Sequence, residues 1–444
     1  MKKIYLAIAA VLITAFSVFS MQVTPMVAKT KLYVKAIGEI AHAHLFNFMA
    51  RQGLILGANT LTGLIPTLYE ALDIVSRESV GFVPAVAKNS SGEKAALNET
   101  ITIPVTPATS LIDITPGQVP ASSGGQIIAP TSMTISKSKA AEVLWNGEEQ
   151  RGMNNAGTYG GVLTNQFVQA FRALGNSVET DLAALATAAS RGYGTPGTAP
   201  FGTASDMSDF AQTRKILIDN GAPQGDLHLV MNTTAAANLR GKQSGLFKVN
   251  EAGSAELLRT GSIALPVEGF MMHESGQIAT FVKGTGASYT TNTAGYAVGS
   301  TAITLITGTG TVLAGDVVTF AGDTNKYGVA VGTAAAGVIT LAEPGLRVAI
   351  PASATAMTVG ASYTANVAFD RNAIQLITRA PAMPVGPDGK AIDMAEDVME
   401  LQDPVTGIVF QIAMYRLYRQ IKYEIGLAWG VKALAPRHIA LLLG

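Results

Sequence analysis

Cysteine is absent from this chain of 444 residues. Its absence excludes disulfide bonds and thiolate metal sites, so packing and association must stabilise the folded state. Charge is also scarce: Asp, Glu, Lys and Arg make up 14% of the residues, and 31 basic residues balance 31 acidic ones. The chain therefore lacks the overall basic excess with which proteins usually bind the phosphates of nucleic acids.

The apolar content is high. Hydrophobic residues make up 48% of the chain, which excludes a disordered protein, and the length allows two or three domains with their own cores. A subunit that buries much of its surface against neighbouring copies would have this composition. A secreted or membrane-associated protein would have it too, so composition alone leaves the class open.

The motifs that carry catalysis or bind metals are missing. The chain has no G-x-S-x-G nucleophile elbow and no G-x-x-x-x-G-K-[ST] phosphate loop. Five histidines occur, of which His42 and His44 have no third ligand nearby, and His273 lacks the second histidine of a helical zinc motif. We therefore predict no enzyme, no catalytic, cofactor-binding or metal-binding residues, and no cofactor.

The first residues have the pattern of a secretory signal. Two lysines precede an apolar run over residues 4–19, and Val18 and Ser20 suit a cleavage site. The run is shorter than the roughly twenty residues that span a membrane. The alternative is that translation starts downstream, with Met21, Met26 and Met49 as candidates, and that residues 1–48 are a mis-called extension or an unrelated leader.

Four segments have helical periodicity. They are residues 67–79, a long segment over residues 164–190, residues 206–219 with Ser205 as the cap, and residues 233–240. In the long segment the apolar residues recur at spacings of three and four, which gives a helix of roughly 40 Å. Its apolar stripe consists of Phe167, Phe171, Leu174, Val178, Leu182, Leu185 and Ala189. The same stripe would suit any amphipathic helix on a sheet. A loop is predicted over residues 192–203, which are rich in Gly and Pro.

Extended segments flank these helices. Residues 88–132 are polar, with alternation at Ile101, Ile103 and Val105 that predicts a β-excursion. Residues 276–365 are rich in Gly, Thr, Ala and Val, and they predict a small all-β module inserted in a mixed core. Its expected strands are residues 302–306, 316–321, 327–331 and 337–342. One strand is expected before the module, at residues 227–231. After the module, strands are expected at residues 367–369, 374–378, 411–419 and 422–432.

Several segments, in chain order, resemble the coat proteins of tailed bacteriophages of the short-tailed, Salmonella-phage type. The strongest are NVAFDRNAIQLITRAPAMPVG at residues 366–386 and YRQIKYEIGLAWGVKALAPRHIALL at residues 418–442. QGLILGANTLTGLIPTLYEAL, which begins shortly after Met49, resembles the start of those proteins. AGDVVTFAG at residues 314–322 and GVITLAEP at residues 337–344 resemble their inserted β-domain.

The resemblance implies an α+β fold, the tailed-phage major-capsid fold that herpesvirus capsid floors share. Its parts are a spine helix, an extended loop, an N-terminal arm, axial and peripheral regions, and an inserted small all-β domain. The corresponding division is a leader at 1–48, a first part of the capsid core at 49–275 (arm, extended loop, spine helix and peripheral region), the β-domain at 276–365, and a second part of the core at 366–444.

The resemblance also implies a role. Many copies would self-assemble, as hexamers and pentamers, into the icosahedral procapsid of a phage or prophage, with a scaffolding protein and a portal. The shell would enclose double-stranded DNA without reading its sequence, and the protein would be found in the virion after assembly in the host cytoplasm. The alternative is a secreted, self-associating surface-layer or adhesin-like protein, exported if residues 1–20 act as a signal peptide.

Overall fold

The computed structural model describes residues 64–75, 81–105, 116, 129–155, 159–243, 266–387, 392–404 and 406–444. The chain divides after Gly63, and all of these residues belong to its second unit, Leu64–Gly444. The signal-like run, the candidate starts at Met21, Met26 and Met49 and the predicted leader at 1–48 lie outside the described residues. None of the helices in these ranges combines the length and apolar content needed to cross a bilayer.

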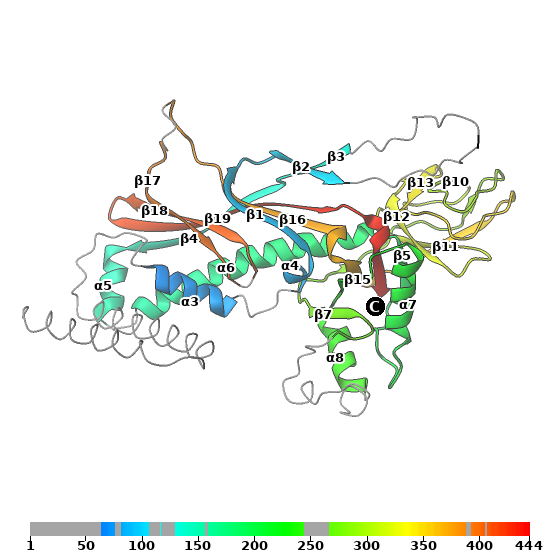
Figure 1. The fold of residues 1–444 in the computed structure, drawn as a ribbon, viewed down its shortest axis with the longest axis horizontal. Coiled ribbons are helices and arrows are strands. Elements are labelled where there is room, and N and C mark those ends of the chain that lie inside the picture. The colour runs from blue at the N-terminus through cyan, green and yellow to red at the C-terminus, as the bar shows by residue number, and fades with distance from the viewer. Residues whose placement is uncertain are drawn as a thin grey trace, which may run out of the picture. The chain divides into compact units, whose positions relative to one another are not determined.

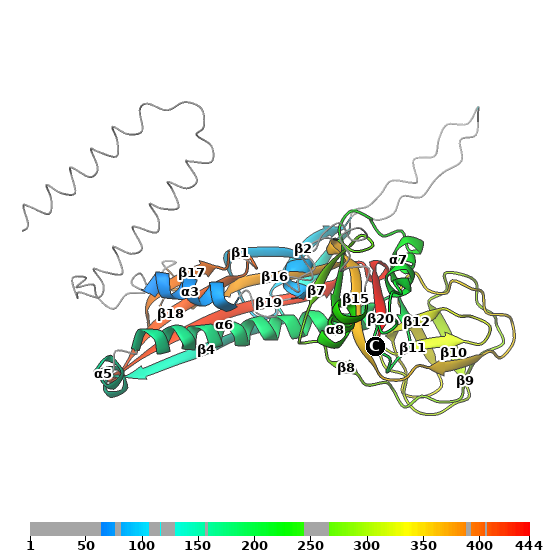
Figure 2. The ribbon, with the colours of Figure 1, turned by 90° about the horizontal axis from the view of Figure 1, so that it is seen from below.

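The predicted long helix is present as α6, Tyr159–Ala184, and it continues for one turn as a 3-10 helix, η2, Leu185–Ala188. Its predicted stripe is buried through Leu182, which confirms the periodicity. α6 contacts the shorter helices α3, Ile65–Val75, and α4, Phe82–Ala85, and also the sheet strands β4, Lys137–Asn146, and β19, Gln420–Ala433. Figure 2 shows α6 running along this sheet, with β4 and β19 behind it.

A six-stranded sheet packs on α6, and we call it the peripheral sheet. Its order is β1-β16-β19-β18-β17, and β4 pairs with the other edge of β19. Phe167 and Phe171 of α6 meet Tyr423 and Phe410 of the sheet edge-to-face, with ring centroids 5.6 and 5.1 Å apart. These aromatic contacts join the helix to the sheet. The remaining strands are β1, Ala87–Ala95, β16, Ile374–Pro381, β17, Ala395–Gln402, and β18, Val409–Leu417.

The predicted β-excursion forms a two-stranded ribbon. β2, Thr100–Val105, pairs antiparallel with β3, Ala129–Thr134, in one uninterrupted register. Ile101 and Ile103 lean on a small buried cluster in which Ala95, Met133 and Ile135 meet Ile377 and Ala428 of the peripheral sheet. The ribbon is therefore anchored on the peripheral sheet. The predicted excursion is confirmed for β2 and β3, whereas its first residues, up to Ala95, belong to β1 of the peripheral sheet.

A second sheet, which we call the axial sheet, has the order β5-β20-β15-β6-β7. Helices α7, Ser208–Asp219, and α8, Thr233–Lys242, pack on it around an apolar core (Figure 1). Its strands are β5, Arg191–Gly194, β20, Ile439–Leu443, β15, Tyr363–Asp370, β6, Leu227–Met231, and β7, Phe270–Glu274. The predicted strand at residues 227–231 coincides with β6.

Two local predictions here were wrong. The loop predicted from Gly192 begins with a strand, because β5 pairs in parallel with β20 near the end of the chain. The glycine-rich sequence of β5 does not indicate this partner. Ser205 does not cap α7: it has φ +57°, and the helix starts three residues later, where Asp206 Oδ1 accepts from the Ser208 N–H at 2.9 Å. Aspartate is an equally good partner for the free N–H groups of a helix start.

Strands β9 to β14 form a closed barrel inside the predicted 276–365 insertion. The order is β11-β14-β9-β10-β13-β12, and a further β11–β12 pairing closes it, so every strand has two neighbours. The barrel has its own core, which includes Tyr289, Phe320 and Tyr327. The strands are β9, Tyr289–Thr291, β10, Ala302–Ile306, β11, Val317–Phe320, β12, Lys326–Val331, β13, Val338–Leu341, and β14, Ala356–Val359.

The barrel is joined to the axial sheet by two short pairings. β12 pairs with β5 through Lys326–Gly192 and Tyr327–Arg191. β8, Thr280–Phe281, pairs with Tyr363 and Thr364 at the start of β15. The predicted insertion, which ends at residue 365, therefore overlaps with a strand of the axial sheet. The barrel is thus an extension of the axial sheet with a core of its own.

Two glycines give a matched test of the packing between α6, the ribbon and the peripheral sheet. A Cβ on Gly430 would lie 2.2 Å from the carbonyl oxygen of Thr134, whereas a Cβ on Gly175, inside α6, would meet nothing within 4 Å. We expect Gly430→Ala to lower the free energy of unfolding by about 3 kcal/mol. Gly175→Ala should raise it by about 0.5–1 kcal/mol, because a mid-helix glycine gives up more backbone entropy. Urea unfolding of the unassembled subunit measures both, and equal effects would contradict the close approach.

Candidate functional site

The described residues contain no group of three or more His, Cys, Asp or Glu side chains placed to hold a metal ion. Of the histidines considered from the sequence, His42 and His44 lie outside the described residues. His228, His273 and His438 are described, and the first two come together. The polar clusters that the fold does build are buried links between elements and one open cavity.

The first link is Glu179 of α6, a glutamate that is only 1% exposed. Its Oε1 accepts from the N–H groups of Gly81 and Phe82, each at 2.7 Å, and its Oε2 accepts from the Val83 N–H at 3.2 Å. The carboxyl group thus takes up the free N–H groups at the start of α4. Burial raises the pKa of Glu179, and these hydrogen bonds partly offset that rise.

Glu179 was not singled out from the sequence, although a signal exists. It follows Val178 and lies eight residues after Phe171, so it falls on the apolar stripe of the long helix. A charged residue on such a stripe is buried only when it is paired. What the stripe could not show is the partner, because the start of α4 is almost a hundred residues away.

A second link joins α6 to the peripheral sheet. Asp181 accepts from the indole N–H of the fully buried Trp429 at 2.8 Å and forms an ion pair with Lys137 of β4. One carboxylate therefore connects the long helix to two neighbouring strands. The indole N–H of Trp145 makes a similar contact at 2.7 Å with Gln166.

The third cluster is a pair of histidines on the neighbouring strands β6 and β7. His228 Nδ1 and His273 Nε2 are 3.0 Å apart, His228 Nε2 is 2.8 Å from Asp226 Oδ1, and Arg371 Nε is 3.0 Å from Asp226 Oδ2. Arg371 Nε and Nη2 also lie 3.3 and 3.2 Å from His228 Nε2. Two tautomers fit these contacts: in one, His273 donates to His228 and His228 Nε2 donates to Asp226; in the other, His228 Nε2 accepts from Arg371 and His228 Nδ1 donates to His273. Arg371 belongs to the 3-10 turn η4, Arg371–Ala373, which connects β15 of the axial sheet to β16 of the peripheral sheet.

The histidine pair is held neutral. Burial lowers the pKa of His273 to about 4, with further lowering from His228 and Arg371. Burial also lowers the pKa of His228, although Asp226 opposes it. The turn between the two sheets is therefore fastened by a network that contains two uncharged imidazoles at neutral pH.

This network predicts a pH dependence of stability. Because the unfolded histidine takes up a proton near pH 6.5 and the folded His273 only near pH 4, the unfolded state binds more protons between these values. The free energy of unfolding should therefore fall as the pH drops from 6.5 towards 4, by about 1–3 kcal/mol. Above pH 6.5 this contribution is fully present. Urea midpoints at pH 7.0, 6.0 and 5.0 measure it.

His273→Gln provides the control for that series. Glutamine can donate to His228 but cannot take up a proton, so the variant should be less pH-dependent between 7 and 5. Burial raises the pKa of Asp370 and lowers the pKa of His438, but both groups remain in the parent and in the variant, so the difference between the two pH series reports on His273. An identical pH slope in the parent and the variant would contradict the assignment to His273.

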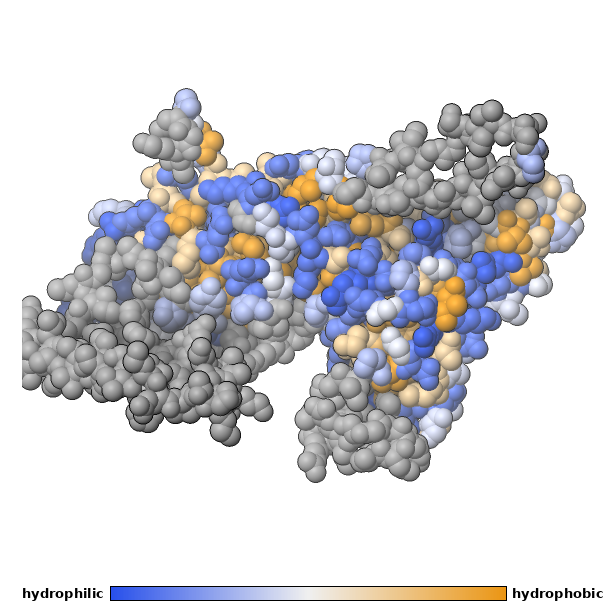
Figure 3. All heavy atoms as spheres, viewed as in Figure 1, coloured by the Kyte–Doolittle hydropathy of each residue, from blue (hydrophilic) through white to orange (hydrophobic). Residues whose placement is uncertain are grey.

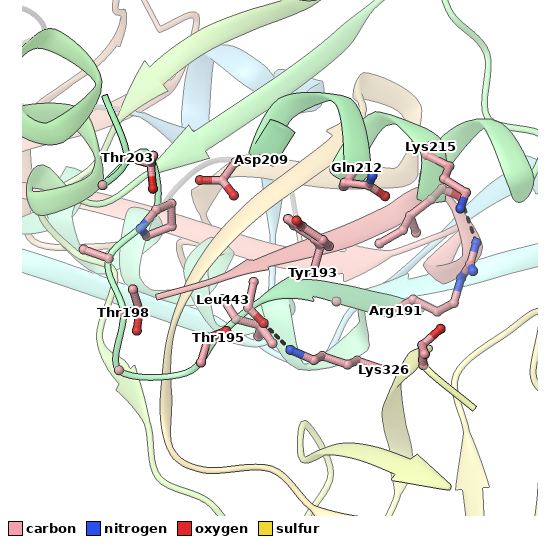
Figure 4. A pocket seen from close by; sticks show the side chains of 18 of the residues that line it. Arg191, Tyr193, Thr195, Thr198, Thr203, Asp209, Gln212, Lys215, Lys326 and Leu443 are labelled. Atoms are coloured by element: carbon pink, nitrogen blue, oxygen red, sulfur yellow. Dashed lines mark hydrogen bonds between the residues drawn. The ribbon is translucent and has the colours of Figure 1, made fainter. Parts of the chain in front are cut away.

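The cavity lies where the barrel meets the axial sheet (Figure 4). It has a volume of about 860 Å³, and its walls are formed by β5 and the turn after it, by α7 and by the start of β12. Arg191 on β5, Lys215 on α7 and Lys326 on β12 all line it, although the three residues come from distant parts of the chain. No residue of this cavity was predicted as a site from the sequence.

Comparison with known proteins supports the resemblance seen in the sequence. Residues 161–325 match a family model described as P22 coat protein, gene protein 5. The matched region begins in α6 and runs through α7, β6 and α8 into the barrel as far as the turn before β12. No curated protein matches the chain.

Solved structures with a similar course of the chain include three particles. One is from Mycobacterium phage Che8, with 13% identity, a TM-score of 0.38 and coverage of 84% of this chain and 87% of that chain. The capsid of cyanophage P-SCSP1u has 11% identity, a TM-score of 0.44 and coverage of 82% and 88%. A virus-like particle from Pyrococcus furiosus has 8% identity, a TM-score of 0.39 and coverage of 85% and 98%.

All three TM-scores lie below 0.5, so the likeness rests on the family match and on the elements of this chain. The long helix, the β-ribbon anchored on the peripheral sheet, the two sheets and the barrel between β7 and β15 are the parts that the resemblance implied. The chain is α+β, and it resembles the major capsid proteins of tailed phages, of the P22 coat protein type.

Proposed function

We propose that this chain is the major capsid protein of a tailed phage or of a prophage-derived particle. It is a structural protein, and many copies assemble into an icosahedral shell. The single observation that carries the proposal is the family match over residues 161–325, which covers the long helix and extends into the barrel. We further propose that the protein has no enzymatic activity, no cofactor and no catalytic or metal-binding residues.

The β2–β3 ribbon supports an assembly role. It has only two strands, and an isolated two-stranded ribbon is marginally stable in water. Its described residues contact the peripheral sheet through Ile101, Ile103 and Met133, and Lys432 Nζ donates to the Ser132 carbonyl oxygen at 2.8 Å. In a shell the ribbon would lie on a neighbouring copy and gain there the packing that its own subunit does not provide.

Exposed apolar side chains support the same role. Met394, just before β17, is 84% exposed, and Tyr418, in the turn between β18 and β19, is 90% exposed. The barrel exposes another group, which includes Val298, Val331 and Val338. Figure 3 shows apolar residues both near the start of β17 and over the barrel, among polar neighbours. Apolar side chains gathered in this way mark interaction surfaces.

Such contacts would each be modest and would act together. A standard protein interface buries about 1,600 Å². Shell subunits share several interfaces, and the sum of weak contacts stabilises the shell while single contacts can still be corrected during assembly. We propose hexamers and pentamers of this chain, a scaffolding protein and a portal as partners, and assembly in the host cytoplasm around double-stranded DNA. The DNA would be enclosed without sequence recognition, which requires no strong basic patch and is compatible with a chain of zero net charge.

The domain division at 49–275, 276–365 and 366–444 remains part of this proposal. The two parts of the core would fold together, because β15 and β20 from the last part pair with β5 and β6 from the first. The inserted barrel would set the spacing between neighbouring subunits.

Electron microscopy of the full chain, expressed in bacterial cytoplasm and recovered from the void fraction of a sizing column, tests the proposal. Closed shells, alone or with co-expressed scaffold, are the expected result. Flat lattices or fibres made only by chain exported and cleaved after Ser20 would overturn it in favour of a surface-layer protein.

A further inference from the structure

The cavity between the barrel and the axial sheet has features that shell assembly does not require. Figure 4 shows Tyr193 in its middle, with Arg191 and Lys215 on one side, Lys326 below and Asp209 above. About 860 Å³ is within the range of small-ligand sites and far exceeds what one water molecule needs. Its lining is rich in polar groups, so the space suits a polar ligand.

The charge of the lining is predominantly positive. Four cationic side chains, from Arg191, Lys215, Lys242 and Lys326, line the cavity together with two carboxylates, Asp209 and Asp219. Both carboxylates are engaged: Asp219 forms an ion pair with Arg191 at 3.2 Å, and Asp209 accepts from the Phe201 N–H at 2.7 Å. The side-chain ammonium groups of Lys215 and Lys242 form no ion pair or hydrogen bond with another described residue.

Arg191 carries a donor that the protein leaves unused. The residue is 4% exposed, and its Nη1 donates to Asn325 Oδ1 at 3.1 Å. Its Nε is buried and has no acceptor among the described residues. A buried donor without an acceptor is unfavourable, so the wall of the cavity holds one arginine with an unsatisfied donor. Lys326 is also withdrawn from water, and burial lowers its pKa, although its ammonium donates to the carbonyl oxygen of Gly194.

We propose that this cavity binds a phosphate-type oxyanion of the size of pyrophosphate. A tetrahedral oxyanion accepts hydrogen bonds from several directions, which suits cations that converge from β5, α7, α8 and β12. The phosphates of a free pyrophosphate and those of a nucleoside triphosphate share this chemistry. Binding does not depend on shell assembly, so the proposal stands apart from the proposed function.

The position of the site gives the bound anion a structural effect. Lys326 and Asn325 belong to the barrel, whereas Lys215 and Lys242 belong to the helices on the axial sheet. Direct pairing between β12 and β5 involves only two residue pairs. An anion held by both groups of cations would therefore tie the barrel to the axial sheet and stabilise their junction.

Isothermal titration of the full-length subunit with pyrophosphate at low salt tests the site. We expect one saturable site per chain and a pyrophosphate-dependent rise in the midpoint of thermal unfolding. Lys215→Gln/Lys242→Gln should bind pyrophosphate at least about tenfold more weakly. These two lysines are chosen because replacing Arg191 or Lys326 would also remove contacts within the protein, to Asp219, Asn325 and Gly194, and could change its stability. Adenosine triphosphate serves as a second probe, and equal affinity indicates recognition of the phosphates alone, whereas tighter binding indicates a nucleotide site.

The matched control is Lys94→Gln/Lys283→Gln. Both lysines are exposed and lie outside the cavity, and the double variant loses the same net charge. It should bind pyrophosphate like the parent protein. Equal weakening in the two double variants would show attraction to surface charge in general and overturn the proposal. Absence of saturable binding to the parent protein would overturn it as well.

Discussion

Replacing Glu179 by alanine should leave little folded subunit. The change removes the acceptor of three backbone N–H groups at the start of α4 and leaves them buried without partners. Each orphaned donor costs about 1–3 kcal/mol, so we expect a loss of at least about 3 kcal/mol in the free energy of unfolding. Whole domains are stable by only about 5–15 kcal/mol. The soluble fraction after expression and the urea midpoint of the soluble protein measure the effect.

Glu179→Gln and Glu148→Ala complete this experiment. Glutamine keeps one oxygen but places an amide donor against a backbone donor, so its effect should fall between those of the parent and the alanine variant. Glu148 is an exposed glutamate of α5, Gly147–Asn155, and its removal should change stability by less than about 0.5 kcal/mol. If Glu179→Ala were as stable as Glu148→Ala, Glu179 would not be the anchor of α4.

The position of Glu179 extends the effect from stability to assembly. The segment that Glu179 holds leads from α4 through β1 to the β2–β3 ribbon, which is the proposed contact with a neighbouring copy. Phe82 in the same turn stacks on Phe369 of the axial sheet, with centroids 6.3 Å apart. Loosening this turn would therefore release the segment that leads into β1 from both α6 and the axial sheet. Any Glu179→Gln protein that folds should assemble more slowly than the parent, measured by light scattering.

Deleting the barrel is the second change with a large expected effect. Removing residues 285–360 and joining the ends with a short Gly-Ser linker would leave β8 and β15 in place. β5 would then lose the pairing with β12 and become an open edge, and the Gly328 N–H that serves the Ser190 carbonyl oxygen would be gone. The hydroxyl of Tyr363, which donates to the Gly315 carbonyl oxygen at 2.7 Å in a buried site, would lose its acceptor. An unpaired strand edge promotes aggregation.

We therefore expect the deletion variant to accumulate mainly as insoluble protein, and any shells it forms to vary in size. A matched control is Leu305→Ala, a barrel-core change that keeps all backbone pairings and should destabilise the barrel by about 2–5 kcal/mol. Solubility, sizing chromatography and electron microscopy with co-expressed scaffold distinguish the two. Uniform shells of normal size from the deletion variant would show that the barrel is not needed for either role.

Local signals in the chain predicted much of the fold. The apolar stripe from Phe167 to Leu182 and the alternation in β10 were recognisable because each element buries one face, and periodicity records that face. The β6 segment was recognisable as a short, mostly apolar run, and all five of its residues are buried. The composition change over residues 276–365 marked the segment that contains the barrel. A module of short strands and tight turns is rich in Gly, Thr and Val and has no segment with helical periodicity.

Other elements depended on contacts that no local pattern contains. β5 has four residues, two of them glycine, and is a strand only because β20 and β12 pair with it. The closure of the barrel depends on the β11–β12 pairing. The sequence does not predict this pairing, because the same strands would have the same sequence pattern in an open sheet. α7 starts at Ser208, because Ser205 has a left-handed backbone conformation with φ +57° and Asp206 accepts from the Ser208 N–H.

By itself the sequence determined that the chain is α+β, built around one long amphipathic helix, free of disulfides, without an overall basic excess, and similar to phage coat proteins. Only the tertiary structure decided what Glu179 holds, that His228 and His273 touch, and that four cations share one cavity. The reason is physical: these groups are separated by tens to hundreds of residues, and their partners are set by strand pairing and helix docking. Short-range propensity and periodicity act over a few residues, so they carry no information about such meetings.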